Sequence, residues 1–149
     1  MSAVRPAELG LTLDCARPGE LAAFWSLALG YVEPDPPSGW ASWQEWLVAQ
    51  GVPEDEWDDG AYLVDPAGVR PPLSLLRVPE PKTAKNRLHL DLKVTGGRDV
   101  DQAVRERLIR ERADLLVRAG ATVVQEVAGL AGLDHLVLAD PEGNEFCVV

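Results

Sequence analysis

The residues best suited to chemistry lie in one short segment, where charged side chains alternate with leucines. Arg87, His89 and Asp91 occupy every second position. This is the period of a β-strand with one buried face, so the three polar side chains should share the other face. A neutral imidazole accepts a proton near pH 7, and a neighbouring carboxylate can orient it. The pattern makes His89 a candidate general base; the alternative is a histidine that only makes a hydrogen bond inside the fold.

Arg87 offers a further function, because a guanidinium can bind a substrate carboxylate with two parallel hydrogen bonds. The same side chain could instead form a structural ion pair with Asp91 or Glu80, and we favour that interpretation. Asn86 or Arg87 could also position a developing oxyanion. His135 is a weaker candidate, because the pattern does not decide which face of its strand it occupies.

The two cysteines, Cys15 and Cys147, are most simply interpreted as small buried residues. Cys147 lies among Phe146, Val148 and Val149, apolar surroundings that raise the pKa of a thiol and leave it unreactive. The alternative for Cys147 is a contact with a ligand. Neither the cysteine spacing nor the N-terminus has the features of a secreted protein, so we expect a cytoplasmic location.

Tryptophan is concentrated in one segment, since four of the five tryptophans are Trp40, Trp43, Trp46 and Trp57. They could form a wall that stacks on a flat or cationic ligand. Trp43 and Trp46 lie three residues apart, so they could equally pack a helix onto a sheet. We favour this packing interpretation.

The net charge of the chain argues against nucleic-acid and membrane partners. The net charge of −10 repels phosphate backbones and anionic lipid heads, so we expect no nucleic-acid or membrane partner. Apolar runs are far shorter than the roughly 20 residues of a membrane span. The 149 residues suit one domain, residues 1–149, of ordinary globular composition.

The first half of the chain predicts a strand, a helix and two further strands. Residues 9–15 alternate, and a helix opening at Pro18 buries Leu21, Phe24, Trp25 and Ala28 and ends at Gly30. The capping box Ser42-Trp43-Gln44-Glu45 predicts an inserted aromatic helix around 42–50. Residues 61–64 and 73–78 are predicted strands.

The whole chain is interpreted as a strand, a helix and three strands written twice, with the aromatic helix inserted in the first copy. We expect a strand at 87–94, a helix at 100–119 that buries a stripe from Val100 through Val104, Leu108 and Leu115, and strands at 122–127, 133–138 and 145–149. The turn Asp140-Pro141-Glu142-Gly143-Asn144 repeats Asp65-Pro66-Ala67-Gly68. The repetition predicts an α+β fold of two modules, residues 9–78 and 87–149, because each half leaves a sheet face that needs cover.

Three segments carry a resemblance to a known family: residues 21–30, residues 85–92 and residues 140–148. Together they resemble the glyoxalase-like proteins of the vicinal-oxygen-chelate superfamily, relatives of glyoxalase I, extradiol dioxygenases and bleomycin-resistance proteins. The resemblance implies two βαβββ modules that form a curved, cup-like mixed sheet with helices outside. It also implies one small-molecule cavity and a homodimer.

Metal-using members of that family send one ligand from each of four strands. By resemblance these positions fall at about Gly10, about Leu76, His89 and Cys147, and the first two have no donor atom. One imidazole and one thiol are too few for a divalent ion. We therefore expect no metal or other cofactor, unless Asp14, Asp91 or His135 completes a divalent site.

Two functions remain after these steps. The first is a metal-free small-molecule-binding protein of the drug-sequestering kind, whose acidic, aromatic cavity holds a small cationic or planar compound. Its predicted ligand-binding residues are Arg87, His89, Asp91, Trp43, Trp46, Leu76 and Cys147. The second is an isomerase or lyase with His89 as general base. This hypothesis is the weaker one, because the metal that normally acts as Lewis acid in such sites is expected to be missing.

Overall fold

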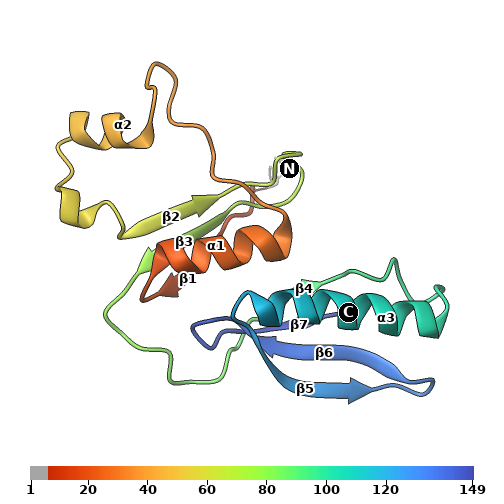
Figure 1. Ribbon diagram of the computed structural model, residues 1–149. Helices are drawn as coiled ribbons and strands as arrows, with labels where there is room; N and C mark the ends of the chain where they lie inside the picture. The colour runs from red at the N-terminus through yellow and green to blue at the C-terminus, as the bar shows by residue number, and fades with distance from the viewer. Residues whose placement is uncertain (1–6) are drawn as a thin grey trace, which may run out of the picture. The chain divides into compact units, whose positions relative to one another are not determined.

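The chain forms two compact units in the computed structural model, which describes residues 7–149. The first unit consists of Met1–Ser26 and Gly30–Pro79, and the second of Leu27–Leu29 and Glu80–Val149. Each unit has its own small sheet of mixed parallel and antiparallel strands (Figure 1).

The first unit holds the predicted strand–helix start and the tryptophan-rich segment. Its elements are β1 (Leu11–Cys15), α1 (Pro18–Leu29), α2 (Trp43–Ala49), the 3-10 turn η1 (Glu54–Glu56), β2 (Gly60–Leu63) and β3 (Leu73–Arg77). Helix α1 begins with proline at its first turn and ends at Gly30, whose φ of 70° is the left-handed conformation that glycine adopts most easily. The four residues predicted to be its buried face are confirmed as buried.

The sheet of the first unit has the order β1–β3–β2, with β1 parallel and β2 antiparallel to β3. Leu63, Leu73 and Leu75 are buried on one face. Because successive side chains of a strand alternate, the opposite face carries Tyr62 and Leu76, which are exposed. We call this second face the open face of the first sheet.

A single antiparallel bridge extends this sheet beyond β2. Val32 pairs with Val64 through two backbone hydrogen bonds of 3.0 and 2.8 Å. Prolines at 34, 36 and 37 follow at once and lack the N–H that a longer strand would need. The third strand expected of a βαβββ module is therefore reduced to this bridge in the first unit.

The second unit has the same topology with a complete set of strands. Its elements are β4 (Asp91–Leu92), α3 (Gln102–Arg118), β5 (Thr122–Ala128), β6 (Leu133–Ala139) and β7 (Glu145–Val148). The order β4–β7–β6–β5, with β4 parallel to β7, corresponds strand for strand to β1, β3, β2 and the Val32 bridge. The internal duplication seen in the sequence is thus also present in the strand order.

The buried face of α3 differs from the predicted stripe. Arg105, Ile109, Ala113 and Leu116 are the buried residues of the helix, whereas Val104 is 37% exposed. These positions recur at helical spacing and face the sheet, where Leu136, Leu138, Phe146 and Val148 are buried. The predicted stripe was wrong because the helix has a second apolar set, which packs against the sheet together with Arg105. The Arg105 Nη1 donates to the Gln102 side chain at 3.2 Å.

The strand predicted at 87–94 is much shorter in the structure, since β4 contains only Asp91 and Leu92. Its pairing partner β7 is itself only four residues long. At its start, the Asn86 side chain accepts the backbone N–H of Glu145 at 3.1 Å, so a side chain replaces the next backbone bond of the ladder. His89 therefore lies just outside the strand.

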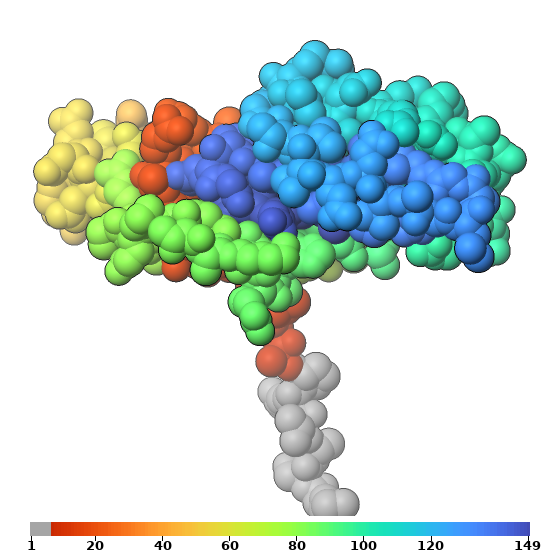
Figure 2. All heavy atoms as spheres, turned by 90° about the horizontal axis from the view of Figure 1, so that it is seen from below, coloured from red at the N-terminus to blue at the C-terminus, as the bar shows by residue number. Residues whose placement is uncertain are grey.

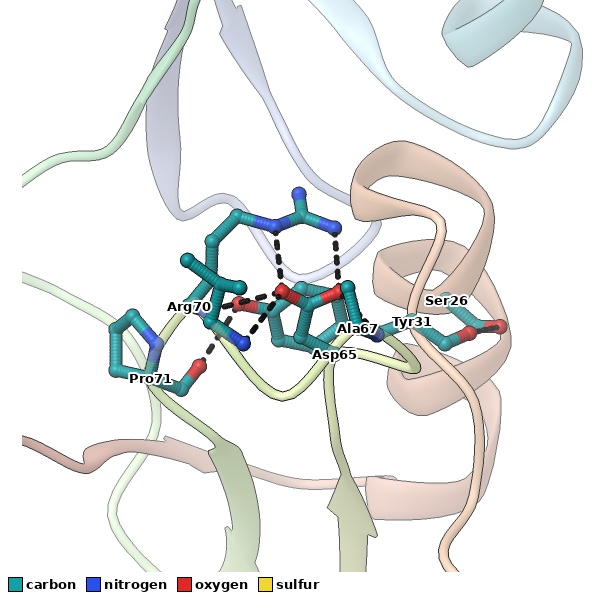
Figure 3. A network of polar contacts seen from close by, with 7 residues as sticks. Ser26, Tyr31, Asp65, Ala67, Arg70 and Pro71 are labelled. Atoms are coloured by element: carbon teal, nitrogen blue, oxygen red, sulfur yellow. Dashed lines mark hydrogen bonds and ion pairs between the residues drawn. The ribbon is translucent and has the colours of Figure 1, made fainter.

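The repeated turns are held by buried aspartates. In the first, the Asp65 carboxylate accepts the backbone N–H groups of Ala67, Val69 and Arg70 and two hydrogen bonds from the Arg70 guanidinium (Figure 3). The guanidinium also lies over the Tyr31 ring, 4.7 Å from its centroid. The Arg70 side chain holds the pKa of Asp65 well below its usual range.

In the second turn, Asp140 plays the same part. Its carboxylate accepts the backbone N–H groups of Glu142 and Asn144, both at 2.9 Å, and the side-chain amide of Asn144. These acceptors replace backbone partners that a turn lacks. The motif that carries the sequence resemblance therefore stabilises the turn before the last strand of each unit.

The α+β class with two modules is confirmed, and each module has its own mixed sheet. None of the helices within residues 7–149 has the length and apolar composition that crossing a bilayer requires.

Candidate functional site

An aromatic pocket lies on the open face of the first sheet. It has a volume of about 640 Å³ and is lined by Trp43, Trp46 and Trp57 on one side and by Tyr62, Ser74 and Leu76 on the other. Ligand cavities in proteins usually have volumes of about 300–1,000 Å³ and mostly apolar linings. We call this hollow the aromatic pocket; its size suits a small organic molecule.

Local sequence signals position the indole rings. Ser42 caps α2 and accepts the backbone N–H of Glu45 at 3.1 Å, as the capping box predicted. The indole N–H of Trp43 donates to the Pro34 carbonyl at 2.8 Å. The rings of Trp43 and Trp46 meet edge to face, with centroids 5.7 Å apart. These contacts fix the wall of the pocket before any ligand is present.

The favoured interpretation was that Trp43 and Trp46 pack α2 onto the sheet. The structure differs from it because neither ring is fully buried. Helix α2 has no buried residue, and both rings are only half-buried. In Figure 1 the helix is joined to the rest of the first unit by long loops. The two rings therefore line a hollow over the sheet instead of filling it.

The electrostatics of the aromatic pocket are acidic. Glu33 and Asp58 contribute to its lining, and both are exposed. No lysine or arginine belongs to the lining. Such a surface attracts cations and repels anions, and indole faces attract cations through the quadrupole of the ring.

Sequence reasoning found only part of this lining. Leu76, predicted as a contact through the family resemblance, lines the pocket and is 49% exposed. Tyr62 and Ser74 were missed, although they alternate with buried leucines in the same way as the residues of the first strand. Glu33 and Asp58 lie in loops, where no periodicity indicates the direction of a side chain.

A second candidate site lies in the second unit and combines His89, Asp91 and Cys147. One donor atom from each residue lies within 4.8 Å of the other two. The register of β4 against β7 places Asp91 opposite Cys147, and the backbone N–H of Cys147 donates to the Leu90 carbonyl at 2.8 Å. His89 lies two residues before Asp91, on the same face. We call these three residues the donor triad.

The thiol of Cys147 is the buried member of the donor triad. It is 4% exposed, and its Sγ lies 3.5 Å from Nδ1 of His89. Burial, together with the neighbouring Asp91 carboxylate, raises the pKa of the Cys147 thiol to about 11. The thiol is therefore protonated near neutral pH, as the sequence predicted.

A fourth residue with a possible donor atom on this face, a glutamate, already forms an ion pair. Glu145 lies two residues before Cys147, and its carboxylate forms an ion pair with Lys85. The hydrogen bond from Lys85 lowers the pKa of Glu145. The Glu145 carboxylate is therefore already held by a lysine, unlike the three residues of the triad.

The neighbouring predicted contacts lie in a surface segment. Arg87 is exposed, and no ion pair joins it to Asp91 or Glu80 within residues 7–149, so the favoured structural pairing is not observed. The side-chain amide of Asn86 is bonded to the backbone of Glu145 and Leu88. The segment that follows residue 80 is visible at the surface in green (Figure 2).

His135 is not part of the triad. Alternation along β6 places it on the face that carries Val137, the partner of Cys147, while Leu136 and Leu138 are buried towards α3. Its Nδ1 lies 2.8 Å from the Asp134 carboxylate, which also binds Arg98. His135 and Arg98 together lower the pKa of Asp134.

The family of the chain follows from comparison with known proteins. A family model described as a glyoxalase-like domain matches residues 10–149. The chain therefore belongs to the glyoxalase-like domain family, within the vicinal-oxygen-chelate superfamily. Among curated proteins, none is similar enough in sequence to count as a match.

Solved structures share the fold at low sequence identity. A glyoxalase/bleomycin resistance protein/dioxygenase family enzyme from Burkholderia phytofirmans PsJN is 15% identical, with a TM-score of 0.61 over 95% of this chain and 97% of that chain. A possible glyoxalase from Bacillus cereus is 14% identical, with a TM-score of 0.55 over 96% and 97%. The fosfomycin resistance protein FosX from Listeria monocytogenes, as a mutant with Mn(II) and 1S,2S-dihydroxypropylphosphonic acid, is 11% identical, with a TM-score of 0.61 over 97% and 90%.

The metal site that the superfamily implies fits this chain only in part. Gly10 lies just before β1 and has no side chain, and Leu76 offers only carbon atoms. Two of the four positions therefore cannot hold an ion in the usual way. His89 and Cys147 can, and Asp91 adds a third donor that the resemblance did not supply. Three side-chain donors with an open fourth position are enough to bind a divalent ion.

Proposed function

We propose that this protein binds a small, planar organic cation in the aromatic pocket and that this binding needs no metal ion. The observation that carries the proposal is the lining: three indole rings and one phenol ring surround about 640 Å³ on the open face of the first sheet. Flat rings present stacking surfaces to a flat ligand, and two carboxylates with no basic side chain favour positive charge.

The binding free energy that the aromatic rings can supply is enough for a ligand of moderate affinity. Each aromatic contact contributes about 0.5–2 kcal/mol to binding a stacked or cationic group. Four such rings give roughly 2–8 kcal/mol, and a dissociation constant of 1 μM corresponds to about 8 kcal/mol. We therefore expect dissociation constants in the micromolar to millimolar range.

Tryptophan fluorescence tests the proposal directly, because three tryptophans line the pocket. The titrants are planar aromatic cations together with neutral and anionic compounds of the same shape. Cations should quench most strongly and bind most tightly. A protein whose fluorescence responds to none of these compounds, or responds best to the anions, would contradict the proposal.

Trp46→Ala and Trp40→Ala form a matched pair of variants. Trp46 lines the pocket, whereas Trp40 belongs to the same tryptophan-rich segment but does not. Removing the Trp46 ring should weaken binding about 5- to 30-fold, the equivalent of about 1–2 kcal/mol. Trp40→Ala should bind like the unmodified protein, and equal losses in both variants would count against the pocket.

A second function is favoured by the donor triad. His89 with Asp91 beside it is an arrangement suited to proton abstraction, as in an isomerase or lyase. His89→Ala should then abolish deuterium exchange into carbon acids in heavy water, measured by NMR, while leaving fluorescence titrations unchanged. If the unmodified protein catalyses no exchange, this second function is wrong.

Assembly and location are further proposals. The family resemblance implies a homodimer, which sedimentation velocity would detect as twice the 16.2 kDa chain mass. A cytoplasmic location agrees with two buried cysteines that form no disulfide. Fractionation of cells that produce the protein would test it.

A further inference from the structure

We propose that a pocket in the second unit, between the first turn of α3 and the loop before β6, binds a small organic carboxylate through the buried guanidinium of Arg105. The pocket has a volume of about 340 Å³, and its lining includes Arg98, Gln102, Arg105, Leu130, Leu133 and Asp134. It shares no residue with the aromatic pocket or the donor triad. The inference therefore goes beyond the proposed function and does not depend on it.

Arg105 is a buried cation with an incomplete set of partners. The residue is 5% exposed, and none of the ion pairs within residues 7–149 includes it. Its Nη1 donates to the Gln102 side chain at 3.2 Å, but its Nε is buried and has no hydrogen-bond acceptor in the described part of the chain. A buried charge without an opposite charge is costly, and an arginine cannot avoid this cost by releasing its proton. A bound anion would supply the missing negative charge and further acceptors.

Neighbouring groups hold the Arg105 guanidinium at the pocket. Gln102 accepts from Arg105, and its own amide donates to the Leu133 carbonyl at 2.8 Å, so this side chain connects α3 to β6. Gly132 lies against the same amide, because a Cβ at this glycine would be 3.0 Å from Nε2 of Gln102. The backbone N–H of Gly129 donates to the Gly132 carbonyl at 2.7 Å and closes the loop. A helix and a tight turn therefore position the cationic group before any ligand is present.

The charges and the apolar residues of the lining favour an organic carboxylate over other anions. Arg98 and Arg105 are positive and Asp134 is negative, so the charged side chains of the lining leave one positive charge. One carboxylate balances that charge, whereas a phosphate carries nearly two negative charges at pH 7. A guanidinium matches a carboxylate with two parallel hydrogen bonds. Leu130 and Leu133 offer apolar contacts to a short hydrocarbon chain.

The Asp134 carboxylate is already paired, which reduces its repulsion of a second anion. Nη1 of Arg98 lies 2.7 Å from one of its oxygens, and Nδ1 of His135 lies 2.8 Å from the other. The Arg98 side chain is 74% exposed. A guanidinium has five N–H donors, so Arg98 keeps donors for an anion in addition to those that bind Asp134. Arg98 is therefore expected to add to the affinity that Arg105 provides.

An NMR titration of the full chain tests the site without any assay of activity. The ligands are butyrate and butyramide, its uncharged counterpart of the same shape, each added to ¹⁵N-labelled protein at constant ionic strength. Butyrate should shift the Nε–H signal of Arg105 and saturate at one molecule per chain, because the guanidinium gains a charged acceptor. Butyramide should bind about 10-fold more weakly or not at all, and inorganic phosphate should bind more weakly than butyrate.

Arg98→Gln and Arg107→Gln form a matched pair of variants. Both arginines are mostly exposed and each forms one ion pair, but only Arg98 lines the pocket. Arg98→Gln should weaken butyrate binding about 10-fold, whereas Arg107→Gln should bind like the unmodified protein. Arg105→Met should fold, because an apolar side chain in place of a buried charge is often tolerated, and should lose butyrate binding. Butyrate should raise the thermal unfolding midpoint of the unmodified protein and not that of Arg105→Met.

Three results would overturn the proposal. The first is an Arg105 Nε–H signal that no butyrate concentration shifts. The second is a pocket that binds butyramide as tightly as butyrate, or phosphate more tightly than butyrate. The third is an equal loss of butyrate binding in Arg98→Gln and Arg107→Gln. Butyrate should leave the indole N–H signals of the aromatic pocket in place, so this proposal and the proposed function fail separately.

Discussion

Replacing Asp140 with alanine should destabilise the protein more than any surface substitution of the same kind. Asp140 is 3% exposed, and its carboxylate accepts the backbone N–H groups of Glu142 and Asn144 and the side-chain amide of Asn144. Alanine leaves these donors without an acceptor. A buried donor that loses its partner costs about 1–3 kcal/mol. We therefore expect a loss of about 2–4 kcal/mol in the free energy of unfolding.

Two control variants separate the causes of that loss. Asp140→Asn keeps one carbonyl oxygen that can accept a backbone N–H, so it should lose only about half as much as the alanine variant. Asp99→Ala removes an exposed carboxylate and should change the free energy of unfolding by less than about 0.5 kcal/mol.

Urea denaturation followed by far-ultraviolet circular dichroism measures these changes. All five tryptophans lie in the first unit, so tryptophan fluorescence follows only that unit, whereas Asp140 lies in the second. With a urea slope of about 2 kcal/mol/M, the midpoint of Asp140→Ala should fall by roughly 1–2 M. An alanine variant with the midpoint of the unmodified protein would refute the argument that this carboxylate holds the turn.

Other variants test the remaining physical claims. Alkylation of Cys147 in metal-free protein should be slow at pH 8 and accelerate towards pH 11, because its thiol pKa is about 11; a rate at pH 8 like that of free cysteine would contradict this. The pKa of Asp65 is lowered by Arg70, so this carboxylate adds stability above its unfolded pKa of about 3.9, and that stability is lost as pH falls below it. Asp65→Asn should therefore flatten the fall in stability on acidification, and an unchanged acid profile would be the negative result. Gly30→Ala, at a φ of 70°, should destabilise by about 1 kcal/mol in thermal unfolding, whereas Gly19→Ala, in helical backbone with open space around it, should be neutral or stabilising.

Most of the fold could be predicted from local patterns. The helix from Pro18 to the left-handed Gly30 and the helix capped by Ser42 lie where proline, glycine and the capping box place them. The turn at Asp140 marks the start of the last strand. Each of these signals acts within a few residues, so the sequence contains it fully.

The failures concern residues whose environment is set by distant parts of the chain. The second long helix contains two apolar sets at helical spacing, and packing against the sheet decides that Ile109, Ala113 and Leu116 are the buried set, together with Arg105. The strand around His89 is shorter than its alternating pattern indicated, because its length depends on the partner strand.

The candidate sites were predicted in part for the same reason. Tryptophan clustering pointed to an aromatic surface, but whether Trp43 fills a core or lines a hollow depends on how the loops around its helix close. The sequence placed His89 and Asp91 on one face, yet the pairing of Asp91 with Cys147 is a matter of strand register across 56 residues of chain, which no local pattern fixes.

The position of the ligand can be observed through the indole N–H signals of the five tryptophans in a ¹H–¹⁵N NMR spectrum. The strongest planar cation from the fluorescence series is titrated into labelled protein. If that cation occupies the aromatic pocket, the signals of Trp43, Trp46 and Trp57 shift, while those of Trp25 and Trp40 stay in place. Shifts confined to Trp25 and Trp40, or a spectrum unchanged at saturating ligand, would contradict the proposed function.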